Sequence, residues 1–158
     1  MRLSLIIAGI VIALRTVLYY AGVRVEAFEF VPVHLLAIIL IAYLSGFFLL
    51  RGDPGRGMAE LIRAGLRDTA LYALLIAVFS YIFFKYINPA EFTQRNAMFI
   101  DEFVKQGHSE AEARANVERY YSPFSYATIT FFGLLVLGVM NALLFAALHH
   151  KVLRRFRR

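Results

Sequence analysis

The fold of this chain is decided by Phe30–Leu50, which reads FVPVHLLAIILIAYLSGFFLL and contains no Asp, Glu, Lys or Arg. A helix of about 20 apolar residues is long enough to cross the hydrocarbon layer of a membrane. Three further apolar runs of similar length lie at about Leu3–Val23, Thr69–Ile87 and Phe124–Leu148. The sequence therefore predicts an all-α, polytopic membrane protein with four transmembrane helices.

Composition limits what else the chain contains. Of its 158 residues, 60% are hydrophobic, and four spans use most of the length, so we expect one membrane domain over 1–158. The absence of cysteine excludes disulfides and cysteine-bound metal. The sequence shows no nucleophile elbow, no phosphate-binding glycine loop, no metal-ligand cluster and no internal repeat. We therefore expect a protein that is not an enzyme and that has no cofactor and no nucleic-acid partner.

The distribution of charge predicts the orientation. With the N-terminus in the cytoplasm, the cytoplasmic side carries ten basic and three acidic residues, a net charge of +7. The opposite side carries six basic and eight acidic residues, a net charge of −2. Basic residues in short loops near span ends favour the cytoplasmic side. We therefore expect both termini to be cytoplasmic, in a multi-pass protein of the cytoplasmic membrane.

Two segments between the spans have helical patterns of their own. Residues 51–68 open with a turn and continue as an amphipathic stretch, which we expect to lie along the cytoplasmic membrane surface. Residues 88–122 predict an extracytoplasmic helical hairpin between spans three and four. Its first helix begins at Asn88 and Pro89 and ends at Gly107, and its second begins with a capping box at Ser109.

This hairpin is rich in aromatic residues, and two interpretations of them remain open. They either pack the two helices together or form a docking face for a membrane-protein partner or a second copy of the chain. The candidate partner face consists of Phe92, Phe99, Phe103, Tyr120 and Tyr121.

Among the polar residues of the predicted spans, three form a candidate intramembrane site, because polar and ionisable groups at membrane depth suggest function. Arg15 lies deep in the first span and either extends toward the outer surface or binds an anion or a lipid phosphate inside the bundle. His34 lies near the start of the second span, within reach of the surroundings of Arg15. Asn141, in the fourth span, is expected to hydrogen-bond another helix.

Small and basic residues suggest two further features of the fourth span. Gly138, Ala142 and Ala146 share one helix face and predict a close-packing seam, either inside the bundle or at a dimer contact. A basic cluster follows the span and is a candidate contact for anionic lipids on the cytoplasmic side. Its residues are Lys151, Arg154, Arg155, Arg157 and Arg158.

The C-terminal two thirds of the chain also resemble a known family. The resemblance is carried by Leu71–Tyr86, then Ile87–Phe92 with its Asn-Pro pair, a polar helical insert, Ser122-Pro123 and an aromatic-rich last span that ends in basic residues. This pattern is similar to that of small bacterial inner-membrane proteins that are catalogued only as a domain of unknown function. The resemblance implies a four-span architecture in a bacterial cytoplasmic membrane, and it implies no catalytic residues.

The sequence leaves two functions open. The first is an accessory or scaffold subunit of an inner-membrane complex, which docks through the hairpin. The alternative is a lipid- or anion-binding or transport protein that uses Arg15 and His34.

Overall fold

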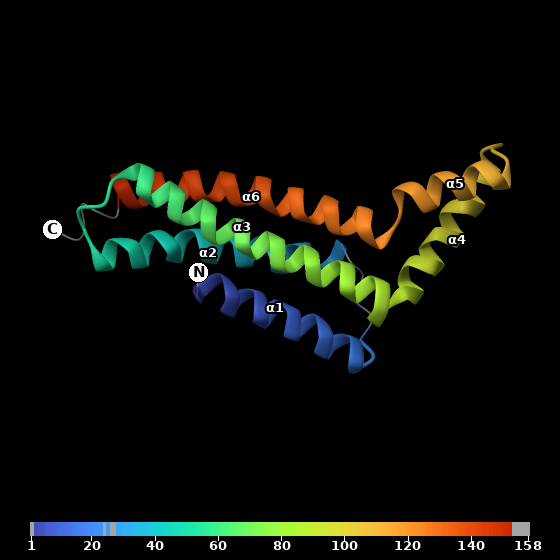
Figure 1. Cartoon of the computed structure of the whole chain (residues 1–158), viewed down its shortest axis with the longest axis horizontal. Helices are drawn as coiled ribbons and strands as arrows, with labels where there is room; N and C mark the ends of the chain where they lie inside the picture. The colour runs from blue at the N-terminus through green and yellow to red at the C-terminus, as the bar shows by residue number, and fades with distance from the viewer. Residues whose placement is uncertain (1, 24, 26–27, 153–158) are drawn as a thin grey trace. The chain divides into compact units, whose positions relative to one another are not determined.

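The structure is a computed structural model that describes residues 2–23, 25 and 28–152 (Figure 1). The described residues form helices and no strand, which confirms the prediction of an all-α fold. In chain order the helices are α1 (Arg2–Tyr20), the 3₁₀ helix η1 (Phe28–Phe30), α2 (Val31–Gly52), α3 (Met58–Ile82), the π-helix η2 (Phe83–Ile87), α4 (Pro89–Lys105), α5 (Glu110–Tyr120) and α6 (Pro123–Lys151).

Four of the described helical segments are long and apolar enough to cross a membrane, as predicted. They are Arg2–Tyr20, Val31–Gly52, Met58–Ile87 and Pro123–Lys151. The chain divides into two compact units. Unit 1 comprises residues 1–76 and 132–158, and unit 2 comprises residues 77–131. The polar residues of the spans lie mainly in unit 1, whereas the helical hairpin lies in unit 2.

The helix that contains the third span begins at Met58, whereas the sequence predicts that this span starts at about Thr69. Met58–Ile82 is one uninterrupted helix, so the amphipathic stretch expected to lie along the membrane forms the first turns of α3. Thr69, at the expected boundary, donates its hydroxyl to the carbonyl of Gly65 at 2.9 Å. The stretch from Met58 to Ile82 contains no proline and no glycine with a positive φ, so the helix continues across the expected boundary. As a consequence, Asp68 lies on the buried face of α3 and not in a surface loop.

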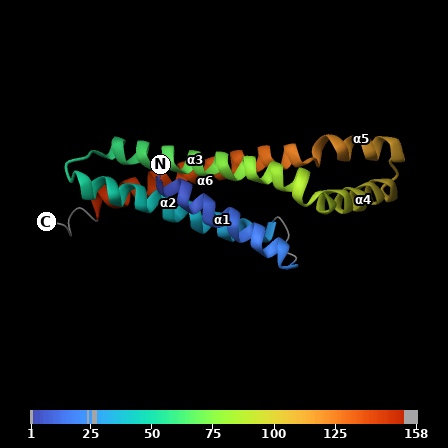
Figure 2. The same cartoon turned by 60° about the horizontal axis from the view of Figure 1, so that its bottom comes forward.

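Within unit 1, α3 and α6 approach each other closely at small residues. A Cβ added to Gly65 would lie 2.9 Å from the Cβ of Ala142, and one added to Gly138 would lie 2.7 Å from Thr69 Oγ1. Ala146, one turn further along α6, is buried with Leu50 of α2 and Leu61 of α3. The predicted seam on α6 therefore lies inside the bundle, where Figures 1 and 2 show α2, α3 and α6 side by side.

Unit 2 is built around an aromatic cluster. The ring of Phe84 in η2 contacts Phe92 of α4, with centroids 5.1 Å apart, and Tyr126 of α6, with centroids 5.0 Å apart. α4 and α5 form the predicted hairpin, closed by a ring contact of 4.4 Å between Phe99 and Tyr121. Ring contacts add to the stabilisation that comes from burial of apolar area, so these residues stabilise the hairpin and its junction with both spans.

The turn between α4 and α5 has Gly107 in the left-handed conformation, as predicted. Gly107 has a φ of +96°, a conformation that favours glycine, and its N–H donates to the carbonyl of Val104. The N–H of His108 donates to the carbonyl of Phe103, and the rings of these two residues lie 5.7 Å apart. These bonds and the ring contact form a Schellman motif, which ends α4.

The two helix starts of the hairpin differ. Ser109 and Glu112 form the predicted capping box at α5. Asn88 makes no side-chain cap to the backbone of α4 and instead donates its amide to Glu91 Oε2 at 3.0 Å. The cause is the preceding π-turn, because the backbone N–H of Asn88 donates to the carbonyl of Phe83 and fixes a conformation unlike that of an N-cap.

The α3–α6 seam predicts opposite effects for two glycines of α6. In Gly138→Ala the new methyl meets the Thr69 side chain, so we expect a loss of about 1–3 kcal/mol of stability from overpacking. In the control Gly133→Ala the new methyl has nothing within 4 Å, and we expect a change between zero and a gain of about 1 kcal/mol. Unfolding of both variants in one detergent measures the difference. Equal stabilities of the Gly138→Ala and Gly133→Ala variants would contradict the close approach of α3 and α6 at Gly138.

The capping box at α5 predicts a pH dependence. The hydroxyl and the backbone N–H of Ser109 both donate to Glu112, which holds the pKa of this carboxyl below its ordinary value of 4.5. Because the folded pKa is the lower one, the box stabilises α5 above pH 4.5 and loses this contribution as the pH falls through the folded pKa. We expect Ser109→Ala to raise the Glu112 pKa in an NMR titration. Thr93→Ala is the control, and equal Glu112 pKa values in the two variants would exclude the interaction.

Candidate functional site

Arg15 lies inside the protein. Its side chain is 7% exposed, and one guanidinium N–H donates to the carbonyl of Val25, in the connection between α1 and α2. The guanidinium carbon also lies 5.3 Å from the ring centroid of Phe30, which is buried at the start of α2. A cation facing an aromatic ring in a desolvated place is attracted to the ring's negative face. Arg15 thus fastens α1 to the connection that follows it and to the start of α2.

The same ring of Phe30 brings His34 into contact with the surroundings of Arg15. Phe30 and His34 are one helical turn apart, and their ring centroids lie 5.6 Å apart in an edge-on arrangement. His34 Nδ1 lies 2.9 Å from the hydroxyl of Tyr72, which is fully buried on α3. Arg15, Phe30, His34 and Tyr72 therefore form one connected cluster across α1, α2 and α3, which we call the Arg15–Tyr72 cluster.

The cluster contains one cation and one hydrogen-bonded pair of side chains. Arg15 supplies a permanent positive charge. His34 and Tyr72 share one hydrogen bond, in which either the phenol O–H donates to Nδ1 or Nδ1–H donates to the phenol oxygen. The described residues contain no group of three or more His, Cys, Asp or Glu side chains arranged to hold a metal ion.

Asn141 does not join the cluster. Its side-chain amide donates to the carbonyl of Leu137 at 2.8 Å, one turn earlier in the same helix. The prediction of a bond to another helix is therefore wrong for this amide. The side chain satisfies its donor locally, as short polar side chains do when no partner helix offers an acceptor.

Two buried polar contacts of unit 1 were not predicted from the sequence. Ser45 of α2 donates its hydroxyl to Asp68 Oδ2 at 2.8 Å, and Asp68 is only 5% exposed. His149 of α6 is fully buried, with Nε2 2.8 Å from the carbonyl of Tyr43 and its ring stacked on that of Tyr43. Gly46 permits this approach, because a Cβ there would lie 2.6 Å from His149 Cδ2.

The helical period of α3 contains the signal that identifies Asp68 and Tyr72. Leu61, Gly65, Asp68, Tyr72 and Ile76 follow one another at steps of three or four residues, and all five are buried. The helical period of the apolar residues can be extended across the expected boundary at Thr69. It then places both Asp68 and Tyr72 on the packed face of the helix. His149 has a weaker signal, since it continues the Ala142 and Ala146 face by three residues.

The aromatic residues proposed as a partner face do not form one exposed surface. Phe92 is buried against Phe84 and Tyr126, and Phe99 packs on Tyr121. Phe103 contacts His108 in the turn between the helices. Tyr120 and Tyr121 are exposed, at 59% and 40%. Tyr120 also lies under the guanidinium of Arg119, with no aromatic partner in the hairpin among the described ring contacts. Most of these rings therefore stabilise the hairpin itself.

Of the candidate lipid contacts after the fourth span, Lys151 is exposed at the end of α6. Arg154, Arg155, Arg157 and Arg158 lie outside the described residues.

Comparisons with known proteins assign the chain to a family but give no activity. No curated protein and no solved structure matched the chain. One family model matches residues 2–151, which include all four candidate spans and the hairpin. The chain therefore belongs to the family described as "Protein of unknown function (DUF4199)".

Proposed function

We propose that this multi-pass membrane protein is a non-enzymatic accessory or scaffold subunit of a membrane complex, and that the α4–α5 hairpin is its docking element. The observation that carries the proposal is how firmly the hairpin is fixed within unit 2. The cluster of Phe84, Phe92 and Tyr126 joins it to residues of both adjoining spans. The amide of Asn96 also donates to the carbonyl of Tyr121, which ties α4 to the segment before α6.

A fixed hairpin supports docking because a preorganised surface loses little conformational entropy when a partner binds. The aromatic residues are largely used inside the hairpin, so the docking face must consist of side chains that they leave exposed. Met98 on α4 is 71% exposed and Tyr120 on α5 is 59% exposed. Methionine and tyrosine are both enriched in protein interfaces. These two side chains replace Phe92, Phe99 and Phe103 as the residues to test.

The proposal is tested by crosslinking in membranes, followed by purification of the full-length protein. We expect Met98→Asp combined with Tyr120→Asp to remove a specific partner, because charges at the centre of an interface are costly to bury. The matched control is Gln94→Asp combined with Asn116→Asp, which adds the same charge at two exposed positions of the same hairpin. An identical partner set in both variants and the unaltered protein would count against the proposal.

The proposal includes a location in a bacterial cytoplasmic membrane, with both termini in the cytoplasm and the hairpin outside. It is supported by the net charges of +7 and −2 on the two sides. Because the chain has no cysteine, single introduced cysteines serve as labels in the same experiment. A membrane-impermeant maleimide should label Met98→Cys in intact cells and Gly52→Cys only after permeabilisation. The reverse pattern would place the docking element in the cytoplasm.

A second candidate function is the binding of an anion or a lipid phosphate by Arg15. It is favoured by the burial of this cation in the Arg15–Tyr72 cluster, which spans three helices. If the cluster binds phosphate, Arg15→Leu should abolish binding of inorganic phosphate to the purified protein. Arg15→Lys should retain part of it, because the charge remains. Equal phosphate binding by both folded variants would remove this candidate.

A further inference from the structure

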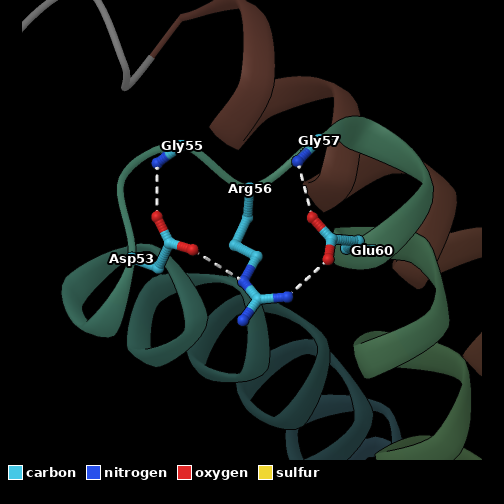
Figure 3. A network of polar contacts seen from close by, with 5 residues as sticks. All are labelled: Asp53, Gly55, Arg56, Gly57 and Glu60. Carbon is cyan, nitrogen blue, oxygen red and sulfur yellow. Dashed lines mark hydrogen bonds and ion pairs between the residues drawn. The ribbon is translucent and has the colours of Figure 1, made fainter.

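The turn between α2 and α3 is closed by a single arginine. Arg56 Nε lies 3.0 Å from Asp53 Oδ2, and another of its guanidinium nitrogens, Nη1, lies 2.5 Å from Glu60 Oε1 (Figure 3). The second oxygen of each carboxylate accepts a backbone N–H, from Gly55 to Asp53 and from Gly57 to Glu60, both at 2.9 Å. Arg56 therefore pairs with both acidic side chains of this turn. We call this arrangement the Arg56 clamp.

The clamp changes the charge that this end of unit 1 presents. Asp53 and Glu60 are both paired with Arg56, and the remaining acidic residue nearby, Asp68, is buried and pairs with Arg67 at 3.3 Å. The ion pairs of the described residues do not include Arg51, Arg63 or Lys151, and these three side chains are exposed. Each acidic side chain is thus paired with an arginine, and Asp53, Arg56 and Glu60 together keep a net charge of only −1. The three exposed cations outweigh this charge.

These three cations lie at the same end of unit 1. Arg51 is in the last turn of α2, Arg63 is in the second turn of α3, and Lys151 ends α6. Leu50, Leu61 and Ala146 pack together beneath them and hold the three helices to one another. Figures 1 and 2 both show the α2–α3 turn beside the C-terminal end of α6.

The surface next to the cations is apolar. Phe48, less than a turn before Arg51, is 52% exposed, and Leu144, two turns before Lys151, is 62% exposed. Both side chains belong to candidate membrane spans, so hydrocarbon tails are their expected surroundings. A group of cations at the edge of a lipid-facing apolar surface matches a phospholipid, with its phosphate at the edge and its acyl chains along the helices.

We propose that Arg51, Arg63 and Lys151 bind the phosphate groups of anionic phospholipids, and that the Arg56 clamp keeps this site cationic by pairing with the Asp53 and Glu60 carboxylates beside it. Arg56 is a positioning residue here, because its guanidinium is engaged by the two carboxylates and acts on the lipid only through them. The site lies at the opposite end of α2 from the Arg15–Tyr72 cluster and is independent of the docking proposal.

The test is native mass spectrometry of the full-length protein with added phosphatidylglycerol or phosphatidylcholine. We expect a preference for phosphatidylglycerol that falls about fivefold for each of Arg51→Gln, Arg63→Gln and Lys151→Gln, the factor expected for one cation near an anionic surface. The matched control is the triple variant Lys105→Gln, Arg114→Gln and Arg119→Gln in unit 2. It is compared with a variant that combines Arg51→Gln, Arg63→Gln and Lys151→Gln. Both lose three positive charges, but only the control should keep the preference for phosphatidylglycerol.

The Arg56 clamp is tested by rescue. Arg56→Gln should weaken phosphatidylglycerol binding, because it releases two carboxylates beside the site. Adding Asp53→Asn and Glu60→Gln to that variant should restore binding, since no anion remains to be held. A thermal unfolding curve of each variant separates a weakened site from a lost fold.

Three results would overturn the proposal. The first is equal binding of phosphatidylglycerol and phosphatidylcholine by the unaltered protein. The second is an equal loss of preference in the site and control triple variants. The third is displacement of the lipid by millimolar inorganic phosphate, which would assign the same cations to a soluble anion.

Discussion

The close approach of α3 and α6 is the contact on which the rest of unit 1 depends. Between membrane helices the hydrophobic effect contributes little, because lipid tails are as apolar as the side chains they replace. Association then relies on close van der Waals packing, which Gly65, Thr69, Gly138 and Ala142 permit. Once α3 is held in this way, its helical period directs Tyr72 toward the α1–α2 side of unit 1, where it meets His34.

The same constraint explains where the polar side chains lie. Asp68, His149 and Tyr72 all sit between helices, and each has a hydrogen-bond partner there. Exposing such groups to hydrocarbon is costly, so a bundle with polar residues must turn them inward and pair them. Arg15 follows this rule through a backbone carbonyl and an aromatic ring. The polar groups therefore contribute to specificity, because rotating α2, α3 or α6 about its axis would separate these partners.

Much of the fold can be predicted from the sequence, because hydropathy, proline and glycine act locally. The four spans, the Schellman turn at Gly107 and the capping box at Ser109 all depend on residues within a few positions of one another. Burial of Asp68 and the partner of Asn141 were not predicted, since each depends on which helix faces which. The sequence also placed a helix boundary where apolarity ends, although a helix continues as long as its backbone bonds are satisfied.

The π-turn at Phe83–Ile87 has a consequence for how mutations spread along the chain. It accommodates one residue more per turn than an α-helix, and an α-helix rotates about 100° for each residue. The turn therefore sets the rotation of α4 about its axis, and with it the contact of Phe92 with Phe84 in the aromatic cluster. Losing a single residue here would rotate α4 by more than a quarter turn relative to Phe84. A single-residue deletion at this point would thus turn a different face of α4 toward the aromatic cluster. A deletion in a flexible loop would leave the facing of the helices unchanged.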